Sequence, residues 1–103
     1  MLIDLYQEQL VPYRDTYGMI CQYDGDSGDT AQRQGLNVVL LSLANHNIEA
    51  ANQIDITLKV LKADTGMYRR TADPHHWGHN PNNLSRDQRA MLELGMAITS
   101  NPE

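Results

Sequence analysis

The sequence predicts a mainly α-helical protein with about four helices in antiparallel hairpins and two long polar loops. Apolar residues recur at intervals of three and four along four segments, which is the spacing of one face of a helix. The second and third of these segments are joined by only three residues, "NHN" at 45–47, a length typical of a helical hairpin. At 103 residues the chain is long enough for one helical domain, 1–103, with one modest core.

The first helix is expected over 2–11, where Ile3, Tyr6 and Leu10 lie at helical spacing. Pro12 follows and disfavours helical geometry at the residue before it. The next stretch is less regular. "GMICQY" is compatible with a short strand or an extended segment, and "DGDSGD" has the composition of a turn.

A second helix is expected to begin near Asp29. Asp29 can cap it, and Gln32, three residues later, completes a pattern that resembles a capping box. Gly35 interrupts the helical pattern and costs about 1 kcal/mol relative to Ala, unless a neighbouring backbone needs the space. We expect this helix to be central because it is apolar over more than half of its circumference. Its expected buried stripe comprises Leu36, Val39, Leu40 and Leu43.

The third segment, 48–63, alternates like a strand and also repeats like a helix. We predict a helix because the run is longer than a typical strand and because "IEAANQ" at its start is rich in helix formers. Asp55 and Lys59 form a favourable i,i+4 pair on such a helix. Gly66 is expected to end it.

The last helix is expected to begin at Ser85, after a long loop over 67–84. Ser85 and Gln88 form an S-x-x-Q capping box, and Asp87 interacts favourably with the positive end of the helix. A loop of this length in a small domain is usually functional or firmly held in place. The apolar line of the last helix comprises Met91, Leu94 and Ile98, with Leu92 and Met96 beside it.

The net charge of −5 and the mixing of acidic with basic residues argue against nucleic-acid binding. Arg69 and Arg70 form the only basic doublet. The N-terminal segment lacks the basic start and apolar run of a signal peptide, and no stretch reaches the roughly 18 to 20 apolar residues of a membrane span. We therefore expect no nucleic-acid or membrane partner, and a cytoplasmic or virion-associated location. Cys21, the single cysteine, is expected to be a small buried hydrophobe.

Carboxylates cluster in "DGDSGD", where Asp24, Asp26 and Asp29 are hard oxygen ligands of the kind that calcium prefers. The segment does not fit an EF-hand, which needs glycine at the position of Asp29 and glutamate at the position of Gly35. We therefore interpret it as a turn followed by a helix start.

Histidines cluster in "HHWGH", where His75, His76 and His79 follow Asp73. Structural zinc sites usually draw their ligands from two separated segments, and this loop is a single short one. We therefore expect neither a metal nor another cofactor. In the interpretation that we favour, Trp77 packs onto the protein and the histidines form hydrogen bonds with backbone carbonyls.

A polar cluster is predicted where the second and fourth helices begin. In an up-down array these two helices run parallel, so their N-termini share one end of the molecule, and the long loop enters at the same end. The cluster suits a carbohydrate or other polyhydroxylated ligand, and it equally suits an internal network that ties the loop to two helix starts, which we favour. The candidate ligand-binding residues are Asp29, Gln32, Arg33, Tyr68, Arg70, Asp73, Trp77, Arg86, Asp87 and Gln88.

Three stretches resemble a pattern in uncharacterised bacterial and phage proteins: "GDTAQRQG" at 28–35, "GMYRRTADPHHW" at 66–77 and "SRDQ" at 85–88. That pattern is G-D-[ST]-x-Q-R, Y-x-R-x-x-D-P and S-R-D-Q, each before or between helices. The resemblance spans about residues 24–98 and implies a piece of an (α/α) toroid, an architecture used by many polysaccharide-acting enzymes. It places the same ten candidate residues at the shared positions. A closed toroid needs many more helices than this chain supplies.

Two functions are therefore expected from the sequence. The first is a small non-catalytic structural or interaction protein, such as a phage or bacterial assembly subunit that binds other protein subunits or itself. The alternative is a carbohydrate-binding or glycan-cleaving module built on the polar cluster. A glycosidase needs two carboxylates on either side of one bond, for which Asp29 and Asp87 are conceivable. Because capping roles are available to both, we assign no catalytic residue.

Overall fold

The computed structural model describes residues 2–10, 14, 19–20 and 29–100. Within them the chain forms four α-helices and no strand, so the predicted fold class is confirmed. Cys21, Asp24 and Asp26, for which we predicted burial and a turn, lie outside these residues. The α-helices are α1 (Leu2–Leu10), α2 (Thr30–Leu43), α3 (Asn47–Leu61) and α4 (Arg86–Ile98), and two short 3-10 helices, η2 (Trp77–His79) and η3 (Pro81–Asn83), lie in the long loop.

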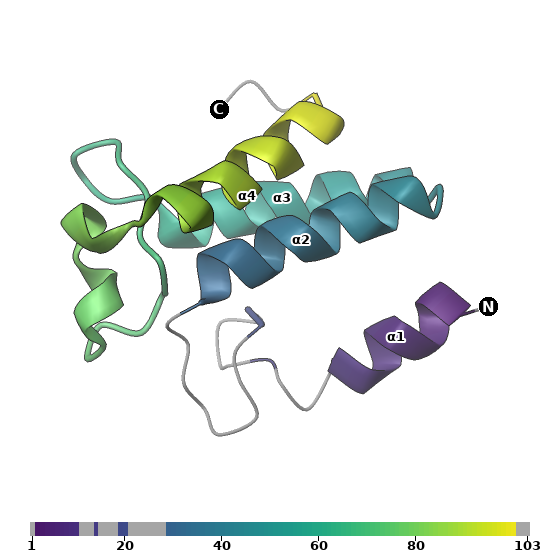
Figure 1. Ribbon diagram of the computed structural model, residues 1–103, viewed down its shortest axis with the longest axis horizontal. Coiled ribbons are helices and arrows are strands. Elements are labelled where there is room, and N and C mark those ends of the chain that lie inside the picture. Colours follow the sequence, from purple (N-terminus) through teal and green to yellow (C-terminus); the bar gives the residue numbers. More distant parts are fainter. Residues whose placement is uncertain (1, 11–13, 15–18, 21–28, 101–103) are drawn as a thin grey trace.

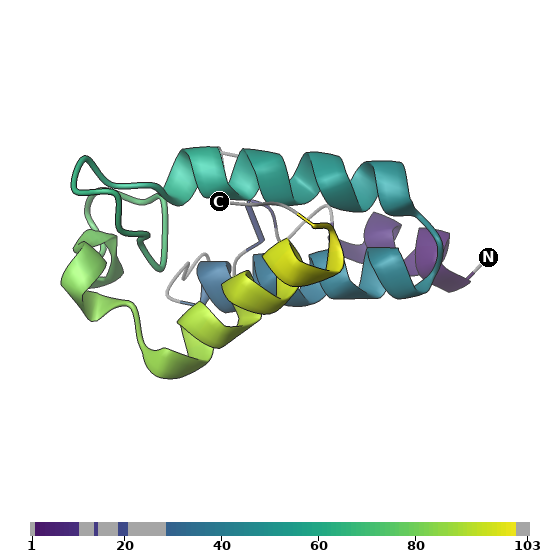
Figure 2. The same ribbon diagram turned by 90° about the horizontal axis from the view of Figure 1, so that it is seen from above.

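The helices α2 and α3 form the predicted antiparallel hairpin (Figure 1). The connection is short, and Asn45 within it adopts a φ of 65°, a left-handed conformation that asparagine tolerates better than most residues. In Figures 1 and 2, α4 lies beside this hairpin and α1 lies at its margin. The amide of Gln7 on α1 donates to the side-chain oxygen of Asn37 on α2 at 2.6 Å. None of the helices built from described residues is long and apolar enough to cross a membrane.

The backbones of α2 and α4 touch at Gly35. A methyl group on Gly35 would collide with the backbone carbonyl of Met91, and one on Gly95 would lie 3.6 Å from the Cα of Gly35. The exception that the sequence left open at Gly35, a neighbouring backbone that needs the space, is therefore the one found. Three residues earlier on each helix, Gln32 contacts Gln88. Because contacts advance in the same direction along both helices, α2 and α4 run parallel and begin at the same end of the molecule (Figure 1).

The core lies between the hairpin helices and extends under α4. One cluster joins Val38 and Leu41 of α2 to the α3 side chains Ala50, Ile54 and Leu58. Tyr68 and Met96 pack against this cluster and also against a second one, and so link the long loop and α4 to the hairpin. The second cluster comprises Ala31, Leu61, Ala72 and Leu92.

The buried face of α2 differs from the predicted one. Leu36 and Leu43 are 44% and 70% exposed, whereas Val39 and Leu40 are half-buried. The prediction was wrong because α2 is apolar over more than half of its circumference, and spacing alone does not tell which part packs inward. The contact at Gly35 sets the rotation of the helix. The residues that it buries are Thr30, Ala31, Gln34, Gly35, Asn37, Val38 and Leu41.

The buried face of α4 and the end of α3 also differ from prediction. On α4, Leu94 and Ile98 are exposed, because Leu92 and Gly95 face the core instead. The helix α3 ends at Leu61, and Lys62 is already extended and pairs with Tyr68 in an isolated antiparallel bridge. The glycine expected to end α3 has a φ of 86° and lies in the turn beyond it. The predicted ion pair of α3 is confirmed, with 2.9 Å between Lys59 Nζ and Asp55 Oδ2.

Two buried polar side chains of α2 hold residue 20 against the core. The side-chain oxygen of Gln34 accepts the N–H of Ile20 at 2.9 Å, and the hydroxyl of Thr30 donates to the carbonyl of Ile20 at 2.8 Å. The amide of Gln34 donates in turn to the hydroxyl of Thr57 on α3 at 2.8 Å. Both backbone groups of Ile20 are thus satisfied inside the protein, and an antiparallel bridge pairs it with Arg14.

Candidate functional site

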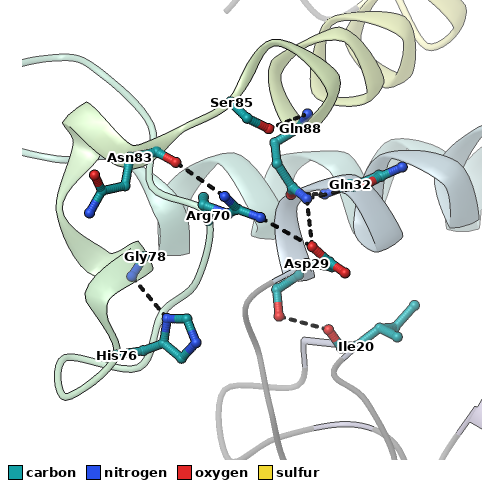
Figure 3. Close-up of polar contacts among 10 residues, drawn as sticks. Ile20, Asp29, Gln32, Arg70, His76, Gly78, Asn83, Ser85 and Gln88 are labelled. Atoms are coloured by element: carbon teal, nitrogen blue, oxygen red, sulfur yellow. Dashed lines mark hydrogen bonds and ion pairs between the residues drawn. The ribbon is translucent and has the colours of Figure 1, made fainter.

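The predicted meeting of the two helix N-termini is confirmed, and the side chain of Gln88 joins them (Figure 3). Gln88 is 2% exposed. Its Oε1 accepts the backbone N–H of Gln32 at 2.7 Å, and its Nε2 donates to Asp29 Oδ1 at 3.0 Å and to Gln32 Oε1 at 3.1 Å. A backbone donor in the first turn of α2, which has no partner within its own helix, is therefore satisfied by a side chain of α4.

The carboxylate of Asp29 does not cap α2 through its side chain, contrary to our prediction. Its Oδ1 accepts instead from Arg70 Nη2 at 3.2 Å and from Gln88, and Gln32 is also engaged with Gln88 rather than in a capping box. A carboxylate forms stronger hydrogen bonds with a guanidinium than with a neutral backbone N–H, which explains why Asp29 binds Arg70 instead of capping α2. Of the two hydrogen bonds of the predicted capping box of α4, one is confirmed: Ser85 Oγ accepts the N–H of Gln88 at 3.4 Å.

Arg70 ties the long loop to this junction. Its backbone carbonyl accepts the N–H of Ala31 at 2.8 Å, and its own N–H donates to the carbonyl of Gly78 at 3.1 Å. Its guanidinium pairs with Asp29, donates to the carbonyl of Asn83 at 3.5 Å and lies 4.7 Å from the centre of the Trp77 ring. The side chain is largely buried, so the cation is held between a carboxylate and an aromatic face.

Trp77 is 60% exposed, so the prediction that it packs down onto the protein was wrong. Its ring lies over the guanidinium of Arg70, and its backbone carbonyl accepts a hydrogen bond from the side-chain amide of Asn83 at 2.6 Å. The ring of His76 lies 5.1 Å from that of Trp77. The loop is thus fixed through its polar groups, and most of the indole surface stays in contact with solvent.

Two side chains of the loop over 73–79 accept backbone N–H groups, whereas the bonds that we predicted join histidines to backbone carbonyls. The Nδ1 of His76 accepts the N–H of Gly78 at 2.9 Å (Figure 3), and Asp73 Oδ1 accepts the N–H of His75 at 2.9 Å. In the part of the chain that the structure describes, no three His, Cys, Asp or Glu side chains gather in a way that could hold a metal ion.

Five of the ten candidate residues come together. They are Asp29, Gln32, Arg70, Trp77 and Gln88.

The other five lie elsewhere. Arg33, Arg86 and Asp87 are exposed and take no part in the bonds given above, whereas Asp73 shapes its own turn and Tyr68 packs against the core.

Sequence reasoning missed Asn83 and His76 as parts of this cluster. Asn83 contributes a carbonyl to Arg70 and an amide to Trp77, and the ring of His76 packs near the indole. The available signal was local: asparagine-rich segments next to proline form tight turns, so side chains a few residues apart are brought together.

Comparisons with protein-family models, with curated proteins and with solved structures find no match for this chain. The resemblance to pieces of an (α/α) toroid stays a prediction. The polar groups of Asp29, Gln32, Arg70 and Gln88 are directed at one another, which is the arrangement of an internal network. These four residues form a structural junction, and the exposed indole of Trp77 lies beside it, over the guanidinium of Arg70.

We expect Gln88→Ala to lower the free energy of unfolding by about 1–3 kcal/mol, because it leaves a backbone N–H of α2 without its partner in a buried place. Gln32→Ala is the matched control: it removes a side chain of the same type but keeps that N–H and its acceptor, so its effect should be smaller. Urea unfolding followed by circular dichroism measures both. Equal losses in the two variants would contradict the role given to the Gln88 carbonyl.

Proposed function

We propose that the protein works by association with other protein subunits through an apolar surface on α2 and α4. The observation that carries the proposal is the exposed stripe of α2, in which Leu36, Val39, Leu40 and Leu43 recur at helical spacing without being fully buried. Large apolar side chains scattered singly over a surface need no explanation, whereas a continuous row marks an interaction site.

The helix α4 extends this surface. Ile98 lies on the same row of α4 as Met91 and Gly95, which meet α2 at Gly35, and Leu94 is its neighbour in that helix. Leu94 and Ile98 are both exposed. One apolar row on α2 and one on α4 therefore begin near the contact at Gly35, and both run toward the C-terminal ends of these parallel helices.

A second copy of the chain, or a related helical subunit, is the partner that this surface suits best. Helices bury apolar rows by packing against other helices, and a row on each of two parallel helices offers two ridges for that packing. The resemblance of three motifs to bacterial and phage proteins adds the proposal that the assembly belongs to a phage or a bacterium. No catalytic step is required.

The test compares Leu36→Glu with Ile56→Glu. Both side chains are 44% exposed, but Ile56 lies on α3 among Asn52, Gln53 and Lys59, outside the apolar surface of α2 and α4. We expect the unsubstituted chain to self-associate at micromolar concentration in sedimentation-velocity runs, and Leu36→Glu to weaken that association about tenfold or more, since a charge would be buried. Ile56→Glu should associate normally. A chain that stays monomeric at millimolar concentration, or equal effects of the two changes, would contradict the proposal.

A second function, carbohydrate binding, is favoured by one specific observation. The exposed indole of Trp77 lies over the guanidinium of Arg70 and beside the exposed side chain of Asn83, which is a suitable platform for stacking a sugar ring. Asp29 is engaged by Arg70 and Gln88, so the proposed role is binding rather than cleavage. Trp77 is the only tryptophan, so quenching of its fluorescence by a panel of oligosaccharides tests the idea directly, and saturable quenching is the expected result. Unchanged fluorescence across the panel would exclude it.

A further inference from the structure

A cavity of about 440 Å³ lies between α4 and the two arms of the long loop. One wall is the side of α4 that carries Leu92 and Met96, and the other walls come from Tyr68 and Leu84 of the loop. This volume is within the range of pockets that bind small molecules. The cavity is separate from the junction of Asp29 and from the apolar rows proposed above to bind other subunits.

The floor of the cavity is apolar and belongs to the core. Leu92 is fully buried, and Tyr68, Leu84 and Met96 pack against the core cluster that contains it. Met67 stands half-exposed at the edge. Methionine side chains adapt to ligands of different shapes because they are unbranched and polarisable, so a site with two of them accommodates a flat or irregular apolar group.

The charged residues of the lining are already paired. The Nε of Arg89 donates to Glu93 Oε1 at 3.1 Å, and these two residues are the only charged ones that line the cavity among the described residues. One cation and one anion in contact leave no net charge on the lining. A charged ligand would therefore have to compete with the ion pair, whereas a neutral ligand leaves it intact.

We infer that this cavity binds a neutral, predominantly apolar small molecule with an aromatic or alicyclic ring. The ring would lie over Leu84, Leu92 and Met96, and a hydroxyl or amide group at its edge would reach the polar side chain of Asn82 at the mouth. The inference is independent of the proposed association, because none of the residues in the apolar row of α2 lines the cavity.

The chain carries an internal control for locating such a ligand. Met67 and Met96 line the cavity, whereas Met19 is buried away from it and Met91 lies on another side of α4. In protein labelled with ¹³C at the methionine methyl groups, we expect titration with naphthol to shift the Met67 and Met96 resonances along saturable curves. The Met19 and Met91 resonances should stay in place. Equal shifts at these four of the five methionine methyl groups, or no shift at Met67 and Met96, would overturn the inference.

Two charged probes with the same ring test the neutral character of the site. Naphthalenesulfonate and naphthylmethylammonium should each bind about threefold or more weakly than naphthol, because either charge disturbs the pair of Arg89 and Glu93. Met67→Glu should weaken naphthol binding by placing a carboxylate at the apolar edge, and Ile56→Glu, on α3 and outside the lining of the cavity, should not. Tighter binding of either charged probe would overturn the assignment to a neutral ligand.

Discussion

The contact between the backbones of α2 and α4 at Gly35 is the constraint on which the rest of the structure depends. Any side chain at this position would collide with the carbonyl of Met91, so only glycine lets the helices approach so closely. This approach places the first turn of α4 within hydrogen-bonding distance of the first turn of α2, where the amide of Gln88 satisfies a backbone donor and binds Asp29. Arg70 adds the long loop to the same carboxylate, and the loop in turn forms one side of the cavity.

The same contact decides which side chains remain outside. With Gly35 directed at α4, the helix α2 presents Val38 and Leu41 to α3, and this rotation leaves Leu36 and Leu43 on the surface. The apolar rows to which we assign subunit association are thus a consequence of the helix crossing. The polar junction differs from these apolar rows, because its side chains form hydrogen bonds with one another. It lies where α2 and α4 begin.

Much of the fold could be predicted from the sequence, because helical spacing, a three-residue connection and a serine cap are local signals. The meeting of Asp29 with Gln88 could also be predicted, since an up-down array fixes the relative direction of its helices. What could not be predicted depends on packing between distant segments. Which part of the wide apolar face of α2 is buried, and where the carboxylate of Asp29 finds its partner, depend on how close α4 lies.

The exposure of Trp77 has a similar cause, because its position follows from the burial of Arg70 beneath it, 4.7 Å from the ring centre. The sequence analysis interpreted the loop as one in which Trp77 packs onto the protein, and only the contact with the guanidinium shows why this residue stays outside.

The most direct measurement of the central claim is the free energy of unfolding of Gly35→Ala, with Gly95→Ala as the reference. In an ordinary helix the change from glycine to alanine stabilises by about 1 kcal/mol. Here we expect Gly35→Ala to destabilise the protein by about 2 kcal/mol or more, because the added methyl group pushes against backbone that has no room to move. A methyl group on Gly95 would lie 3.2 Å from the flexible end of the Ile54 side chain, so Gly95→Ala should lower the free energy of unfolding by less than Gly35→Ala does. A Gly35→Ala variant as stable as the parent, or more so, would contradict the account.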